Sequence, residues 1–235
     1  MMKEPVEALF PRFSRPVYRF GVWSVGGLIR RAYRIEVEGI GSVPATGPAI
    51  VAANHVSHLD PLSITSVIGR RITYLAKAEY WDSRFIGPLF TIAGQIPVER
   101  TSSEAASSVV GGMRVLGNGG VLGVHPEGTR SRDGRLYRGR TGTARLAAAS
   151  GAPVIPVGVL GTYAVYPKHA TRPKLRGRIT VRFGSPIYWP QRTNATAATL
   201  RAFTEELMSA IASLSGQEYC DTYSDGYVRR SSAPR

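Results

Sequence analysis

The fold is decided by one stretch of the chain, AIVAANHVSHLDP at residues 49–61. The apolar run 49–53 predicts a short buried strand, and Asp60-Pro61 predicts a helix with Asp60 as N-cap and Pro61 at its first position. His55 should therefore leave a strand end. A turn can then bring the Asp60 carboxylate to one ring nitrogen of His55 and leave the other as a base near neutral pH. The alternative is an ordinary loop histidine beside an aspartate that only caps its helix.

Short strands and helices alternate on both sides of this stretch. Strands are predicted at 34–37, 49–53, 72–76, 95–98, 120–124, 154–160 and 179–183. Helices are predicted at 60–68, 79–92 with a break near Gly87-Pro88, 101–116 with a capping box of Thr101 and Glu104, 141–149, and about 200–214. This alternation predicts an α/β fold, a mostly parallel central sheet covered by helices on both faces, with ligands at strand ends.

The charge of the chain is high and unevenly placed. The 235 residues are 43% hydrophobic and 20% charged, which favours one folded domain, yet the net charge is +14. The excess lies in residues 1–34, 128–145 and 165–182 and suits an anionic membrane surface, a phosphorylated substrate or nucleic acid. No nucleic-acid-binding module is recognisable, so that partner is not expected. Cys220 is the single cysteine, and with four histidines there is no Cys/His metal spacing, so no metal site is predicted.

Residues 5–34 mix aromatic and apolar side chains with arginines, and no apolar stretch reaches the length of a spanning helix. This pattern predicts an amphipathic helical segment that docks in the membrane interface. The alternative is a helix packed on its own domain. The chain is thus divided into a docking segment (1–34), a catalytic domain (35–216) and a loose tail (217–235).

Three further stretches stand out, two of them with charged side chains that suit substrate binding. GQIPVER at 94–100 ends a predicted strand with Arg100, whose guanidinium can hold a phosphate. HPEGTRS at 125–131 contains a tight turn, forced by Pro126 and Gly128, that can aim Glu127 and Arg130 into one pocket. VIPVG at 154–158 places Pro156 inside an apparent buried strand, which predicts an edge strand or a requirement of shape. Each stretch alone is also compatible with a solvated surface turn or an ordinary strand.

In this order, the four stretches resemble the motifs of the glycerolipid acyltransferase family, and most closely its 1-acylglycerol-3-phosphate acyltransferases, over about residues 35–185. They match Asn-His-x-x-x-x-Asp, Gly-x-Ile-x-Val-x-Arg, Pro-Glu-Gly-Thr-Arg-Ser and a Val-Pro-Val-like strand. Lys77-Ala78-Glu79 resembles the family's Lys-x-Glu. His125 departs from the pattern, because the family usually has an aromatic or aliphatic residue there.

The resemblance implies direct acyl transfer. His55, held by Asp60, would deprotonate the free hydroxyl of a lysophosphatidate, which attacks the thioester of acyl-CoA or acyl carrier protein and yields phosphatidate for phospholipid biosynthesis. No metal, cofactor or covalent enzyme intermediate is implied, and the expected location is the cytoplasmic face of the membrane, peripheral or monotopic. The implied substrate-binding residues are Lys77, Arg100, Glu127, Gly128, Thr129 and Arg130, and the implied structural ones are Asn54, Pro126 and Pro156.

Other interpretations stay open at this point. The acceptor can be another lysophospholipid or a glycolipid, and the oligomeric state is undetermined. A lipid hydrolase would use Ser57, Ser63 or Cys220 as nucleophile with His55 or His58 as base, although the Gly-x-Ser-x-Gly elbow is absent. A protein that only binds an anionic ligand is a third possibility. The side chains that suit an acyl groove, or equally plain core packing, are Trp81, Phe85, Ile86, Leu89 and Phe90.

Overall fold

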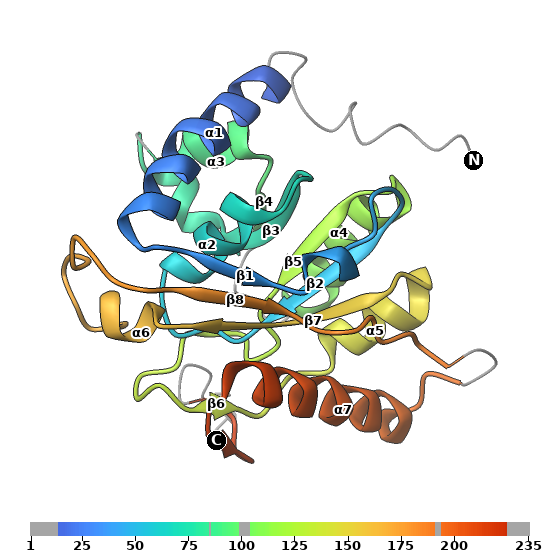
Figure 1. Ribbon diagram of the computed structural model, residues 1–235. Coiled ribbons are helices and arrows are strands. Elements are labelled where there is room, and N and C mark those ends of the chain that lie inside the picture. Colours follow the sequence, from blue (N-terminus) through green and yellow to red (C-terminus); the bar gives the residue numbers. More distant parts are fainter. Residues whose placement is uncertain (1–13, 85, 99–103, 191–193, 225–235) are drawn as a thin grey trace, which may run out of the picture.

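A seven-stranded sheet organises the part of the computed structural model that is described, residues 14–84, 86–98, 104–190 and 194–224 (Figure 1). The strand order is β1-β8-β7-β2-β5-β3-β4, and all neighbours are parallel except β7 and β8. The strands are β1 (Glu36–Glu38), β2 (Ala49–Ala53), β3 (Ile72–Lys77), β4 (Ile96–Val98), β5 (Val121–Val124), β7 (Val154–Leu160) and β8 (Thr180–Phe183). A separate short sheet pairs β6 (Leu136–Tyr137) with β9 (Tyr219–Cys220).

Helices cover both faces of the main sheet (Figure 1). One face carries α4 (Glu104–Gly117), α5 (Gly142–Ser150) and α7 (Ala197–Ser215), and the other carries α1 (Ser14–Ala32) and α2 (Leu59–Val67). The remaining elements are η2 (Ile40–Ser42), η3 (Ala78–Asp82), α3 (Ile86–Ala93) and α6 (Thr162–Val165). This architecture confirms the predicted α/β fold with a mostly parallel sheet between two helical layers.

The central strand β2 contributes side chains to the hydrophobic cores on both faces of the sheet. All five of its residues are buried, with Ile50 in the core beneath α4, α5 and α7 and Val51 in the core beneath α2. Successive side chains of a strand point to opposite faces, so this fully apolar strand supplies both cores at once. Its three alanines leave room for large side chains from the helices. The residues that follow β2 therefore leave the middle of the sheet from a rigid support.

The helix after β2 begins earlier than predicted. α2 starts at Leu59, with His58 rather than Asp60 in the N-cap position, and Pro61 occupies the third helical position. The Asp60 carboxylate does not cap its own helix, because it accepts the N–H groups of Val56 and Ser57 from the preceding loop. The predicted helix start was therefore slightly wrong, because the carboxylate binds the loop that precedes the helix.

Two other predicted elements also differ in detail. The helical stretch 79–92 is divided into η3 and α3, so Gly87 and Pro88 fall in the first turn of α3. β7 is an interior strand between β8 and β2, which makes the edge interpretation of Pro156 wrong. The proline is tolerated because β8 has already ended at Phe183, and Gly184 donates its N–H to the Pro156 carbonyl at 2.8 Å. The capping-box residue Thr101 lies outside the described residues.

Helix α1 packs on the domain by one face and exposes the other. Gly26 faces Ser66 of α2, and the Arg30 guanidinium donates to the Ser66 carbonyl. On the outer face, Phe20 is 66% and Trp23 is 73% exposed. Within the described ranges, none of the helices combines the length and apolarity needed to cross a membrane.

Candidate active site

A histidine and an aspartate meet where β2 ends. His55 Nδ1 lies 2.9 Å from Asp60 Oδ2, and the same oxygen accepts the backbone N–H groups of Val56 at 2.7 Å and Ser57 at 2.8 Å. Since Oδ2 is an acceptor in all three contacts, Nδ1 carries the proton and Nε2 is the basic nitrogen. The predicted pairing of His55 with Asp60 is present, and the two loop amides fix the carboxylate that orients the ring.

The surroundings keep this pair as a neutral imidazole beside a carboxylate. Burial lowers the pKa of His55 to about 3, and the positive charge of Arg130 acts in the same direction. Burial raises the pKa of Asp60, whereas the Thr162 hydroxyl and the N–H donors of the loop lower it. The imidazole is thus available to accept a proton at neutral pH, and the fully buried carboxylate is held by donors on its Oδ2 side.

Glu127 belongs to the frame of the site. It is 2% exposed, and its Oε1 accepts the His55 N–H at 2.8 Å while its Oε2 accepts the Tyr137 N–H at 2.9 Å. Burial raises the pKa of Glu127 to about 8, and the two N–H donors act against that shift. The turn after β5 directs the carboxylate inward, where it holds the His55 backbone. The implied role of Glu127 in substrate binding does not anticipate these two contacts.

A second imidazole lies flat against the first. The rings of His55 and His125 have centroids 3.9 Å apart and planes inclined by 10°. His125 Nδ1 lies 3.1 Å from the Ala53 carbonyl and 3.2 Å from the Asn54 carbonyl, so this nitrogen carries the proton. Burial and the neighbouring His55 lower the pKa of His125 to about 3. Sequence reasoning noted His125 only as a departure from a family pattern.

The turn 125–131 is braced by a lysine that sequence reasoning did not single out. Lys168 Nζ donates to the Arg130 carbonyl at 2.7 Å and to the Thr129 hydroxyl at 3.4 Å. Gly128 has φ +76°, a left-handed conformation that favours glycine, and a Cβ there would lie 3.0 Å from Arg140 Nε. The positive charge of Arg130 lowers the pKa of both His55 and His58.

The other predicted site residues are distributed around this centre. Asn54 is buried and joins β2 to β7, because its amide donates to the Val159 carbonyl at 2.9 Å and accepts the Val159 N–H at 2.8 Å. The Pro126 carbonyl accepts the Arg140 N–H at 2.8 Å. Lys77 ends β3, and Arg100 lies outside the described residues.

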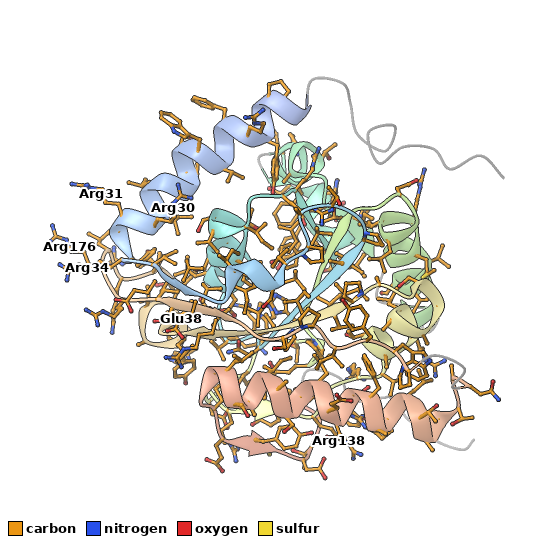
Figure 2. All side chains as sticks on the ribbon, turned by 45° about the vertical axis from the view of Figure 1, so that its right-hand side comes forward. Arg30, Arg31, Arg34, Glu38, Arg138 and Arg176 are labelled. Carbon is orange, nitrogen blue, oxygen red and sulfur yellow. The ribbon has the colours of Figure 1, made fainter. Side chains whose placement is uncertain are left out.

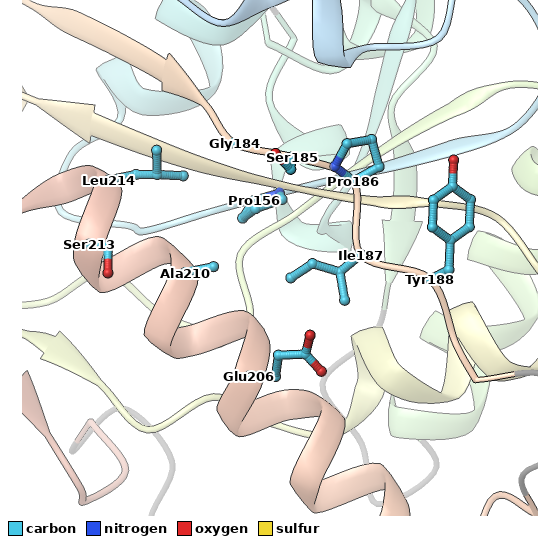
Figure 3. Close-up of a pocket in the computed structure, with 10 residues that line it drawn as sticks. All are labelled: Pro156, Gly184, Ser185, Pro186, Ile187, Tyr188, Glu206, Ala210, Ser213 and Leu214. Atoms are coloured by element: carbon cyan, nitrogen blue, oxygen red, sulfur yellow. The ribbon is translucent and has the colours of Figure 1, made fainter.

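Pro156 lines a pocket that does not include His55 or Asp60. This pocket lies between the segment that follows β8 and helix α7, and is also lined by Gly184, Ile187 and Leu214 (Figure 3). Of the residues predicted for the site, it is the one that this pocket contains. The structure therefore supports a requirement of shape at Pro156, next to Gly184, more than a place at the reacting groups.

The structure describes only some of the residues considered for an acyl groove or as nucleophiles. Trp81 and Phe90 pack edge to face at 5.4 Å, whereas Phe85 and the side chains of Ile86 and Leu89 lie outside the described part. The Ser57 hydroxyl donates to the Tyr166 carbonyl at 2.7 Å. Ser63 is buried in α2, and Cys220 lies in β9. Because its hydroxyl donates to the Tyr166 carbonyl, Ser57 is not set up as a nucleophile for His55.

Within the described ranges, no cluster of three or more His, Cys, Asp or Glu side chains is arranged to hold a metal ion.

Comparison with known proteins agrees with this geometry. The family model named Acyltransferase matches residues 34–160. A chloroplast 1-acyl-sn-glycerol-3-phosphate acyltransferase of Brassica napus is 28% identical over 78% of this chain and 54% of its own length. The enzyme of that name from Limnanthes douglasii is 33% identical over 69% of this chain and 58% of its own length. The chain therefore spans little more than half of these curated relatives.

A solved structure shares the fold. The crystal structure of the 1-acyl-sn-glycerophosphate acyltransferase from Thermotoga maritima superposes with a TM-score of 0.67 at 24% identity, covering 87% of this chain and 83% of that one. The family model covers β2, the His55–Asp60 pair, the turn 125–131 and β7. With the motifs, the histidine–aspartate geometry and this match in agreement, the chain belongs to the acyltransferase family.

Proposed function

We propose that the protein transfers a fatty acyl group from the thioester of acyl-CoA or acyl carrier protein to the free hydroxyl of a lysophosphatidate, producing phosphatidate in phospholipid biosynthesis. The observation that carries the proposal is the 2.9 Å contact between His55 Nδ1 and Asp60 Oδ2, which leaves a neutral basic nitrogen on a rigid loop. The names of the similar curated proteins support lysophosphatidate as the acceptor.

In this scheme His55 Nε2 takes the proton of the acceptor hydroxyl as its oxygen attacks the thioester carbonyl. The tetrahedral intermediate then collapses, the C–S bond breaks, and the proton passes from His55 to the departing thiolate. Asp60 stabilises the transient imidazolium, and general-base help of this kind is worth about a hundredfold to ten-thousandfold in rate. The thioester supplies the activation, so the scheme uses no cofactor and no covalent enzyme intermediate.

Cationic side chains would hold the phosphate of the acceptor. Arg130 is the best placed of the described residues, because its charge acts on His55 and its backbone carbonyl is held by Lys168. A guanidinium can bind a phosphate in forked geometry. Gly128 and Thr129 shape the same turn, and Glu127 fixes its position against His55. Arg100 is the second proposed phosphate ligand, and Lys77 completes the proposed set of substrate-binding residues.

The proposal includes docking at a membrane. The exposed aromatic face of α1 and the basic residues of segment 1–34 suit the interface of an anionic bilayer, with the protein peripheral or monotopic on the cytoplasmic face. Residues 35–216 form the proposed catalytic domain and residues 217–235 the tail. The acyl chains of donor and acceptor would then stay close to lipid during transfer.

The test is a His55→Ala variant, assayed with radiolabelled long-chain acyl-CoA and lysophosphatidate. We expect turnover to fall by at least about a hundredfold. His169→Ala is the matched control, because His169 is exposed and does not belong to the proposed machinery. Parent-level transfer by His55→Ala would refute the assignment of the base. A panel of other lysophospholipids and glycolipids, run with the parent protein, tests the acceptor class.

A further inference from the structure

The basic segment 172–178, RPKLRGR, is not used by the proposed chemistry. It carries four cationic side chains and no acidic one. At its centre Leu175 is 88% exposed, the largest exposure of any large hydrophobic side chain among the described residues. An apolar side chain displayed between Lys174 and Arg176 loses contact with water only if the surface docks against something apolar.

This segment is held to the end of α1. The Tyr33 hydroxyl donates to the Lys174 carbonyl at 3.0 Å, and the Tyr33 carbonyl accepts the Ile179 N–H at 3.0 Å. Tyr33 itself is 7% exposed, so it anchors the loop from the protein interior. Leu175 is therefore displayed by a segment with fixed ends.

The exposed face of α1 runs toward the same place. Leu28 is 68% exposed, and Arg31 follows three residues later on the same side of the helix. Figure 2 shows Arg31, Arg34 and Arg176 gathered at this end of the molecule. The two apolar positions, Leu28 and Leu175, are thus accompanied by a cluster of exposed arginines.

Nearby acidic groups reduce this charge only at its edge. Glu36 lies 3.6 Å from the Arg178 guanidinium, and Glu38 lies 3.0 Å from the Arg182 guanidinium. Both glutamates belong to β1, beyond the loop tip. The cationic residues that we assign to the surface are Arg31, Arg34, Arg172, Lys174 and Arg176.

We propose that the loop 172–178 is a second lipid-docking element, with Leu175 inserted among the acyl chains and the surrounding cations on the phosphates of an anionic bilayer. An apolar tip ringed by arginine and lysine is the arrangement that an interfacial lipid surface recognises. The inference rests on the proposed membrane docking of α1 and extends it to a distant part of the chain.

The segment that leads into the loop is hydrogen-bonded to the candidate active site. Just before it, the Tyr166 carbonyl accepts the Ser57 hydroxyl, and Lys168 holds the Arg130 carbonyl. Lys174 donates its N–H to the Val165 carbonyl at 3.0 Å, which returns the loop to α6. A loop seated in lipid would therefore set the turn 125–131 close to the surface from which the lysophosphatidate comes.

The experiment is sedimentation of the full chain with vesicles of mixed phosphatidylcholine and phosphatidylglycerol. Leu175→Glu should weaken binding at least about tenfold, from the burial of one leucine side chain. Lys174→Gln combined with Arg176→Gln should weaken it about 25-fold, at about fivefold for each charge. Val110→Glu is the matched control, because Val110 is 69% exposed on α4, on the opposite face of the sheet. Thermal unfolding establishes that each variant is folded.

Trp23→Glu on α1 distinguishes this inference from the proposed function. If Trp23→Glu releases the protein from vesicles while both loop variants bind like the parent, the docking of α1 stands and the loop assignment is refuted. If the loop variants keep vesicle binding and lose turnover only with an acyl carrier protein donor, the basic loop is a protein contact, and the lipid assignment is equally overturned. Weaker binding of both loop variants, with the Val110→Glu control unchanged, supports it.

Discussion

Replacement of Asp60 by asparagine removes the charge behind His55 with little disturbance of shape. Asp60 Oδ2 accepts three donors, from His55, Val56 and Ser57. The amide oxygen of asparagine can take the same three contacts. The reverse orientation is unfavourable, because the amide NH₂ would face two backbone N–H groups. The variant should therefore keep both the fold and the His55 tautomer.

The loss should appear in the chemical step. In the proposed reaction His55 takes the acceptor proton, and an imidazolium forms beside the carboxylate. Two unit charges about 4 Å apart at an effective dielectric constant of about 20 attract by about 4 kcal/mol. A proton that is half to fully transferred in the transition state makes the loss about 2–4 kcal/mol, so kcat should fall about 30-fold to 1000-fold. The KM for lysophosphatidate should change little, since buried Asp60 is screened from the acceptor.

Steady-state kinetics at saturating acyl-CoA measure this separation of kcat from KM. Asp133→Asn is the control, since Asp133 accepts from Ser131 and Arg135 in the turn nearby and is 40% exposed. That variant should keep kcat within about twofold. An Asp60→Asn protein that melts like the parent and also turns over like it would refute the electrostatic role. So would a rise in KM with kcat unchanged.

Three further predictions concern the frame of the site. Asn54→Ala leaves the Val159 N–H and carbonyl unpaired and should lower the free energy of unfolding in urea by about 2–6 kcal/mol, at about 1–3 kcal/mol for each buried group. Burial lowers the pKa of His125, so the unfolded chain binds more protons below about pH 6.5 and stability is lost as pH falls. His125→Phe should remove about 1.4 kcal/mol per pH unit of that loss between pH 6 and pH 4, measured by urea unfolding across pH. Arg130→Ala should raise the KM for lysophosphatidate at least about tenfold with a smaller change in kcat, seen in initial rates.

The fold was predictable because its pattern is local. The buried run 49–53 and the alternation of apolar strands with helices require only neighbouring residues, and the mostly parallel sheet follows from the helices that connect the strands. Details differed where the sequence pattern does not show which groups a residue will contact. Asp60 does not cap α2, because its oxygen is used by the loop before the helix. Pro156 sits in an interior strand, because the neighbouring strand ends at Phe183.

The His55–Asp60 pair was predictable for the same reason, since a short turn joins the two residues. The other contacts of the site join segments far apart in the sequence. Glu127 accepts the His55 N–H across 72 residues, and Asn54 reaches Val159 across 105. Each buried backbone amide needs a hydrogen-bond partner. The pattern of apolar residues does not show which amide at a strand end will need one from a distant side chain.

Strand order is the information that would have recovered those contacts. In the order β7-β2-β5, register places Ala52 against both Val124 and Pro156. The segments that leave these three strands then emerge side by side at one edge of the sheet. A carboxylate that follows β5 meets the amide that follows β2, an imidazole there stacks on His55, and a lysine beyond β7 reaches the turn 125–131. The geometry of the candidate site is therefore a consequence of sheet topology, and the motif supplies only the side chains that the topology brings together.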